Sequence, residues 1–83
     1  MSFFGTLGDY ISAKNKLNEL LYNLNKDNIE NNIENSIEEF NVYIDSLEDL
    51  DNEEKTSVKK SGLNEFKKKL FELGIETTIK NLF

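Results

Sequence analysis

The chain contains no cysteine, histidine, proline, tryptophan or arginine among its 83 residues. Without cysteine it has neither a disulfide nor a thiolate metal site to stabilise a small fold. Without histidine it also lacks the commonest general base and the partner of a nucleophilic serine. The lack of proline leaves long helices uninterrupted. These absences argue against an enzyme, and we expect no cofactor and no metal.

The chain is also short and has no long apolar run. An 83-residue chain hides roughly 60% of its unfolded surface, which is enough for one modest core, so residues 1–83 are expected to form a single helical domain. No segment approaches the ~20 apolar residues that cross a bilayer. The start of the chain, MSFFG, lacks the basic beginning and apolar centre of a secretion signal. A cytoplasmic protein without a membrane partner is expected.

Charge is unevenly distributed along the sequence. The net charge of −6 combines a neutral segment, 1–25, with an acidic segment, 26–54, and a basic one, 55–83. The acidic segment holds eleven acids and one lysine, and the basic segment holds seven lysines and three acids. Oppositely charged helices that lie side by side would explain this pattern. An acidic helix that occupies a basic cleft on another protein is the functional alternative.

The acidic segment also carries the clearest helical pattern. Its apolar residues recur every three or four positions, which places them on one face of a helix over about 28–49. They are Ile29, Ile33, Ile37, Phe40, Ile44 and Leu47. A strict four-residue spacing drifts by about 40° per step against the helical repeat. We therefore expect the centre of the core between Ile33 and Leu47, with Ile29 at its edge.

Two further helices are predicted on either side, at about 6–24 and about 52–73. The first has its apolar stripe at Leu7, Tyr10, Ile11, Leu17, Leu20, Leu21 and Leu24. The other has its stripe at Val58, Leu63, Phe66, Leu70 and Leu73, and we expect it to run unbroken through Gly62. Each of the three helices begins with a candidate capping box: Thr6 with Asp9, Asp27 with Glu30, and Asp51 with Glu54. Ser2 is an alternative first cap, which would bring Phe3 and Phe4 into the helix.

The end of the chain has two interpretations. Gly74 is expected to adopt a left-handed conformation and to end the preceding helix, because glycine is favoured there. The segment after it, about 76–83, would then form a short fourth helix; alternatively the long helix continues through Gly74. The predicted fold is all-α: a small up-down-up three-helix bundle with a short C-terminal fourth helix, because short connections make successive helices antiparallel neighbours.

Candidate functional residues lie on the acidic helix and at surplus apolar positions. Glu30, Glu34 and Glu38 follow one another at four-residue spacing, which is more typical of a solvated face than of a cation site. The lysines at 55–69 are the only candidate nucleic-acid feature, and the acidic balance and missing arginine argue against that partner. The predicted partner-binding residues are Glu30, Glu34, Glu38, Glu39, Val42, Tyr43, Phe71 and Ile75.

In general build the chain resembles immunity proteins, phage-encoded inhibitors, secretion chaperones and other helical adaptors, which are all small, acidic and helical. Helical bundles host many functions, and no motif selects among them. From the acidic helix and the surplus apolar residues we expect a non-enzymatic protein-binding module, most simply a small acidic inhibitor or immunity-type protein that occupies a partner with a basic surface. The alternative is a self-assembling structural or adaptor subunit, in which the apolar stripe of the acidic helix serves as an intermolecular seam.

Overall fold

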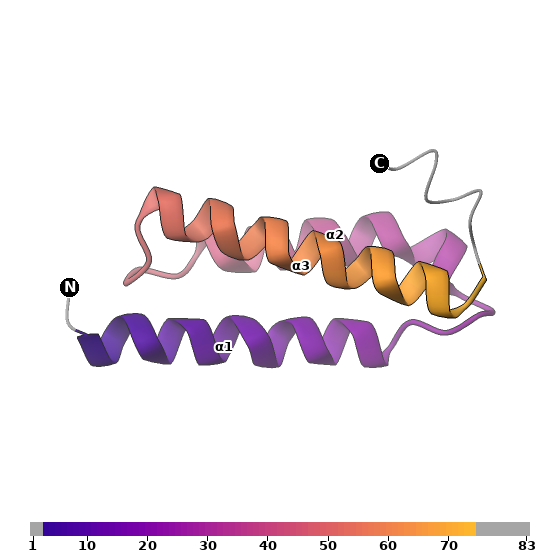
Figure 1. Cartoon of the computed structure of the whole chain (residues 1–83), viewed down its shortest axis with the longest axis horizontal. Helices are drawn as coiled ribbons and strands as arrows, with labels where there is room; N and C mark the ends of the chain where they lie inside the picture. The colour runs from indigo at the N-terminus through magenta and orange to yellow at the C-terminus, as the bar shows by residue number, and fades with distance from the viewer. Residues whose placement is uncertain (1–2, 75–83) are drawn as a thin grey trace.

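The computed structural model describes residues 3–74, and these residues form three helices and no strand. The helices are α1 (Phe3–Tyr22), α2 (Ile29–Asp45) and α3 (Asn52–Glu72). They lie side by side, with α2 running back along α1 and α3 running back along α2 (Figure 1). The prediction of an all-helical protein with three antiparallel-connected helices is confirmed. The predicted fourth helix, 76–83, lies outside the described residues.

The core is centred on the contact between α2 and α3. Phe40 and Phe66 pack edge to face, with ring centroids 6.3 Å apart and planes at 71°. Gly62 lies against the same ring, and a Cβ placed on it would overlap Phe40. The absence of a side chain there allows α3 to approach α2 closely. As predicted, α3 runs unbroken through Gly62. The fully buried side chains are Phe40, Phe66, Ile29, Ile33, Ile44 and Leu70.

The position expected for Ile29 was wrong. Ile29 is 0% exposed, whereas Ile37 and Leu47 are only partly buried. The drift argument assumed that the core follows one straight line along α2. Leu24, which is also buried, belongs to the same core cluster and lies in the connection that precedes α2. Apolar packing at this end of the helix therefore buries a residue that the helix alone would leave at the edge.

Only one of the three predicted capping boxes is present. Asp51 accepts a hydrogen bond from the Glu54 backbone N–H at 2.8 Å, and Glu54 accepts from the Asp51 N–H at 3.0 Å. This box starts α3 by satisfying backbone donors of its first turn. The predicted box of Asp27 is wrong, because Asn28 is the N-cap residue of α2 and makes no side-chain cap bond. The Asn28 side chain instead accepts from the Asn25 N–H at 2.8 Å and shapes the turn.

The predicted cap at Thr6 is also wrong, for a reason that shapes the whole fold. Helix α1 already begins at Phe3, so Thr6 and Asp9 lie inside it. Both reach across to the α2–α3 connection: the Thr6 hydroxyl donates to the Asp49 carbonyl at 3.2 Å, and Asp9 accepts from the Asp49 N–H at 2.8 Å. Gly5 also lies against the Asp49 side chain. These contacts hold the start of α1 against the connection between α2 and α3.

The same contacts explain why α2 is shorter than predicted. It ends at Asp45 rather than near residue 49, and Ser46 follows as its C-cap. The Ser46 hydroxyl donates to the Tyr43 carbonyl at 2.6 Å. Backbone groups of Asp49 bond to α1 instead of continuing the helix. At the other end of α3, Gly74 has a φ of 76°, which confirms its predicted left-handed conformation.

Candidate partner-binding surfaces

The predicted acidic row is exposed along α2. Glu30, Glu34 and Glu38 all have exposed side chains. Within residues 3–74, none of the three forms an ion pair with a lysine. The predicted mutual compensation of acidic and basic helices therefore does not extend to this row. Its carboxylates are exposed to solvent, and like charges at four-residue spacing repel by a few tenths of a kcal/mol per pair.

A shallow hollow of about 360 Å³ lies beside this row, between α2 and α3. Its lining residues are Glu34, Ile37, Glu38, Asn41, Val42, Asp45 and Leu63. Three predicted binding residues, Glu34, Glu38 and Val42, thus meet at one place. Val42 is 62% exposed. The hollow combines an apolar surface with a carboxylate border, which suits a lysine or arginine side chain, since such chains bury an apolar stem and keep the charge at the edge.

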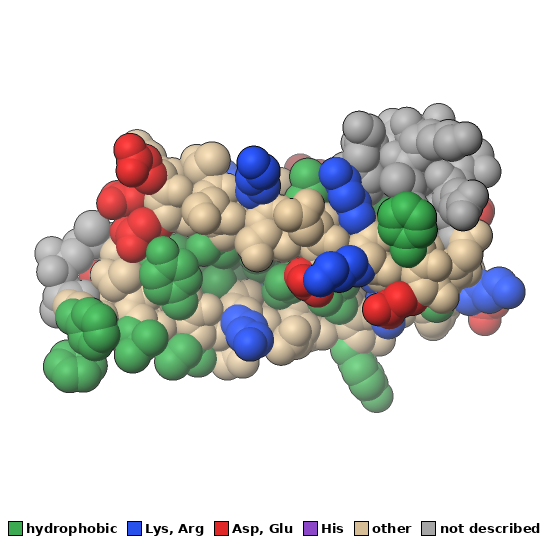
Figure 2. Space-filling model, viewed as in Figure 1, with side chains coloured by type: hydrophobic (Ala, Val, Ile, Leu, Met, Phe, Trp, Pro, Cys, Tyr) green, Lys and Arg blue, Asp and Glu red, His purple; other side chains and the backbone are tan. Residues whose placement is uncertain are grey.

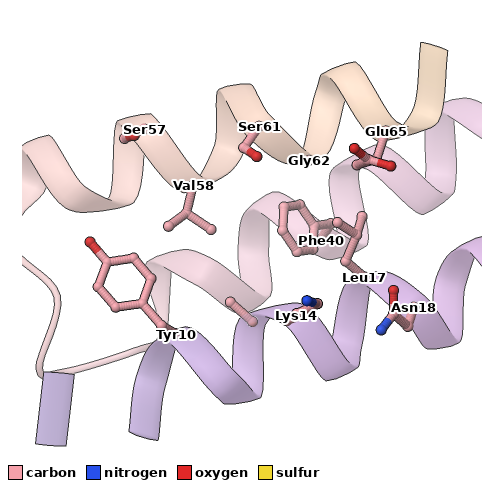
Figure 3. A pocket seen from close by; sticks show the side chains of 11 residues that line it. Tyr10, Lys14, Leu17, Asn18, Phe40, Ser57, Val58, Ser61, Gly62 and Glu65 are labelled. Atoms are coloured by element: carbon pink, nitrogen blue, oxygen red, sulfur yellow. The ribbon is translucent and has the colours of Figure 1, made fainter. Parts of the chain in front are cut away.

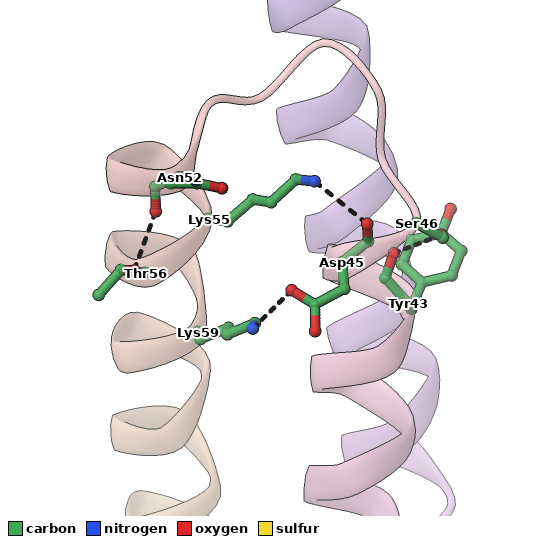
Figure 4. A network of polar contacts seen from close by, with 7 residues as sticks. All are labelled: Tyr43, Asp45, Ser46, Asn52, Lys55, Thr56 and Lys59. Carbon is green, nitrogen blue, oxygen red and sulfur yellow. Dashed lines mark hydrogen bonds and ion pairs between the residues drawn. The ribbon is translucent and has the colours of Figure 1, made fainter.

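Within residues 3–74, the ion pair that joins α2 and α3 lies at the end of α2. Lys59 forms an ion pair with the Asp45 carboxylate at 2.6 Å, and Lys55 donates to the Asp45 backbone carbonyl at 3.1 Å. Figure 4 shows both lysines reaching from α3 to this one residue. Both lysines are therefore engaged with Asp45 at one border of the hollow. The carboxylates of Glu34 and Glu38, at the other border, form no ion pair with them.

Glu39 and Tyr43, also predicted to bind a partner, contact α1 instead. Glu39 pairs with Lys16 at 2.9 Å, and the Lys16 ammonium lies 5.7 Å from the centre of the Tyr43 ring. The hydrogen bond from Lys16 to Glu39 raises the pKa of Lys16, and the charge of Glu19 adds to the rise. A cation above an aromatic ring and a charge-assisted bond both hold α1 against α2. Neither residue belongs to the hollow beside Glu34.

The last two predicted residues lie apart from the hollow. Phe71 is 63% exposed on α3 and does not line the hollow. Ile75 lies outside the described residues. Three of the eight predicted residues therefore line the hollow, Glu34, Glu38 and Val42, and Glu30 continues the acidic row beside it. Two more, Glu39 and Tyr43, face α1, and Phe71 lies apart.

A larger groove, of about 630 Å³, was not predicted. It runs between α1 and α3, and Phe40 of α2 lies at its floor, while Tyr10, Leu17 and Val58 line its walls (Figure 3). Small residues open it: Ala13 on α1 faces Ser57, Ser61 and Gly62 on α3. The sequence signal was this run of small residues in the third predicted helix. The hydroxyl of Tyr10 donates to Glu54 at 3.2 Å; partial burial, and then the Glu54 charge, raises the pKa of Tyr10.

An exposed apolar surface on α1 contradicts the expected role of its first apolar residues. Leu7, Tyr10 and Ile11, predicted to belong to the core stripe, are 45%, 40% and 54% exposed. Phe3 and Phe4 are exposed as well and pack edge to face on each other, with centroids 5.6 Å apart. Figure 2 shows hydrophobic side chains gathered over the start of α1. Only the second half of α1 supplies large apolar side chains to the core.

The described residues hold no cluster of three or more side chains suited to a metal ion. Within the same residues, no helix is both long and apolar enough to cross a membrane. Comparison of the chain with protein-family models, with curated proteins and with solved structures found no match.

Proposed function

We propose that this protein is a non-enzymatic binding module of the inhibitor or immunity type, which occupies a basic surface on another protein. The observation that carries the proposal is the uncompensated acidic row, Glu30, Glu34 and Glu38, beside the apolar hollow at Val42. In this proposal the module works in the cytoplasm, and its partner is neither a nucleic acid nor a membrane.

Several features support a role for the row beyond solubility. The acids are concentrated on one helix, where their mutual repulsion is tolerated although lysines are plentiful on α3. Their helix is held firmly by its buried opposite face, so the charges are presented on a rigid element. A dense field of one sign accelerates association with an oppositely charged surface by long-range attraction. Val42 and Leu63 add apolar area where the encounter becomes a specific contact.

Self-assembly through the apolar stripe of α2 is the less supported function. Ile33, Phe40 and Ile44 are at most 1% exposed and pack within the chain. A seam with a second copy through these residues would require the three helices to separate. The lysines of α3 give little support to a nucleic-acid partner, because Lys59 pairs with Asp45 and Lys68 with Glu65.

The test compares two triple variants with the same change of charge. The first is Glu30→Gln, Glu34→Gln and Glu38→Gln; the control is Asp27→Asn, Glu48→Gln and Glu72→Gln, three exposed acids away from the hollow. Immobilised proteins capture partners from native-host lysate at low and high salt, followed by quantitative mass spectrometry. We expect a basic protein that the unmodified chain retains, that salt releases, and that the first variant retains at least ten-fold less.

The control variant should retain that protein within about two-fold, because screened charges far from the contact contribute little. Circular dichroism verifies that both variants remain helical. Equal retention by the two variants, or retention that does not depend on salt, would overturn the proposal.

A further inference from the structure

A core helix turns its large apolar side chains inward, but the first half of α1 turns them outward. Its inward positions are small or polar: Gly5, Thr6 and Asp9 face Asp49, and Ala13 is buried. Its large apolar side chains point into solvent. We define the α1 apolar patch as Phe3, Phe4, Leu7 and Ile11, with Gly8 between them. An amphipathic helix buries its apolar side, so this half of α1 has the pattern of a helix with a second neighbour.

The size of the patch matches half of a small interface. Its four side chains are 75%, 80%, 45% and 54% exposed in sequence order. With about 150–250 Å² for a whole aromatic side chain, they present on the order of 500 Å² of apolar surface. Two such patches face to face remove on the order of 1,000 Å² from water, and flanking polar residues bring the total near the roughly 1,200 Å² at which specific interfaces begin.

The lack of charge on the patch favours a second copy of this chain as its partner. None of its residues is charged, although the chain carries a net charge of −6. Both acids of α1 are already engaged: Asp9 accepts from the Asp49 N–H, and Glu19 lies 4.0 Å from the Lys16 ammonium. The acidic row is on α2. Two copies can therefore meet across this patch without bringing like charges together, whereas a lipid surface would find no lysine between Phe3 and Ser12.

We infer that two copies of this chain associate through the α1 apolar patch, with their α1 helices antiparallel about a two-fold axis near Leu7 and Gly8. In that arrangement Phe4 of each copy lies opposite Ile11 of the other. A Cβ placed on Gly8 would meet nothing within 4 Å, and glycine carries no side chain, so the facing backbone can approach closely. A two-fold contact uses the same patch on both copies, which is why one uncharged surface suffices. The site differs from the acidic row, and the two proposals stand or fall separately.

The test is the mass in solution of the full chain over a wide concentration range, by sedimentation equilibrium. We expect the mass to rise from 9.6 kDa towards twice that value. Leu7→Glu and Leu7→Lys place like charges beside the axis, so each should weaken dimerisation at least ten-fold. Mixing the two variants places opposite charges there and should restore a dimer that contains one copy of each. Phe71→Glu, at an exposed phenylalanine outside the patch, is the control and should dimerise as the unmodified chain does.

Helical circular dichroism shows whether each variant is folded, and Ile11→Glu provides a second test if Leu7→Glu unfolds. A mass that stays at 9.6 kDa throughout, or a dimer that survives both Leu7→Glu and Ile11→Glu, overturns the inference. So does a mixture of the glutamate and lysine variants that remains monomeric. Vesicles of phosphatidylcholine alone (neutral) or mixed with phosphatidylglycerol (anionic) test the lipid alternative. A protein that stays monomeric and binds such vesicles through the patch would show that the patch binds lipid, and this result also refutes the dimer.

Discussion

The contact between α2 and α3 and the first half of α1 use apolar residues in opposite ways. At the α2–α3 contact the large side chains point inward, and Gly62 allows the helices to approach until Phe40 and Phe66 are fully buried. In the first half of α1 the inward side is small or polar, and hydrogen bonds to Asp49 hold the helix in place. Both regions are helical and rich in apolar residues. One region supplies the core, whereas the other leaves large apolar side chains exposed, on the surface that we propose binds a second copy.

Truncating one phenylalanine in each region should give losses of stability of very different size. Phe40→Ala removes a ring that is 1% exposed and should lower the free energy of unfolding by about 3–5 kcal/mol. Phe4→Ala removes a ring that is 80% exposed and should change it by no more than about 0.5 kcal/mol. Urea denaturation followed by circular dichroism measures both, at a protein concentration low enough to keep the chain monomeric. Losses of similar size would show that the patch belongs to the core.

Substitution of Gly62 and of Gly8 by alanine should change the free energy of unfolding in opposite directions. Gly62→Ala places a methyl group against the Phe40 ring, with ring atoms at 2.9 and 3.0 Å, and should destabilise the fold by about 1–3 kcal/mol. Gly8→Ala meets nothing within 4 Å and should stabilise it by up to about 1 kcal/mol, because alanine favours helix more than glycine does. The same denaturation experiment at low protein concentration applies. Destabilisation by Gly8→Ala would show that this surface is already covered in the monomer.

The hydrogen bond between Asp9 and the Asp49 N–H should contribute less to the free energy of unfolding than the core does. Asp9→Ala removes the acceptor of the Asp49 N–H and leaves that donor without its partner in a partly buried place, so we expect a loss of about 1–2 kcal/mol. Asp27→Ala, at an exposed acid that caps no helix, is the control and should be nearly neutral. Slower hydrogen exchange of the Asp49 amide than of its loop neighbours would verify the bond in the unmodified chain. Equal effects of the two substitutions would show that Asp9 does not hold α1.

The same contrast explains what the sequence could predict. Features set by neighbours in the chain were predicted: the three helices, the capping box at Asp51, the continuity of α3 through Gly62 and the left-handed Gly74. The buried positions of Ile33, Phe40 and Ile44 also followed from spacing along α2. Each of these depends on residues within one or two helical turns, where periodicity and capping rules apply directly.

Features set by contacts between distant segments were missed. Thr6 and Asp9 have the spacing of a capping box, but Asp49, forty residues from Asp9, is their actual partner. Leu7 and Ile11 have helical spacing with the core residues of α1, yet a helix with apolar residues on two sides does not reveal which side faces the core. Among the predicted binding residues, Glu34, Glu38 and Val42 meet at one hollow, whereas Glu39 and Tyr43 contact α1 because Lys16 lies opposite them.

Alkaline pH should weaken the attachment of α1 more than the contact between α2 and α3. We expect this effect on stability to be the smallest of those considered, and it arises because Tyr10 and Lys16 of α1 titrate at high pH. The pKa of Tyr10 is raised by partial burial and by Glu54, and that of Lys16 by its bond to Glu39. A pKa that is higher in the folded chain means that the folded state holds the proton more tightly. The stabilisation is therefore complete below the ordinary values, near 10, and is lost as pH rises through the folded values.

We accordingly expect the free energy of unfolding to fall as pH rises above about 10, and Tyr10→Phe and Lys16→Met each to make that fall shallower. Urea denaturation at a series of pH values gives the slope, and Tyr22→Phe, at the exposed tyrosine of the same helix, is the matched control. Amide exchange at each pH should show α1 opening before α2 and α3, since the core between α2 and α3 contains no buried polar or charged side chain among the described residues. Simultaneous opening of all three helices would mean that α1 is as firmly held as the core.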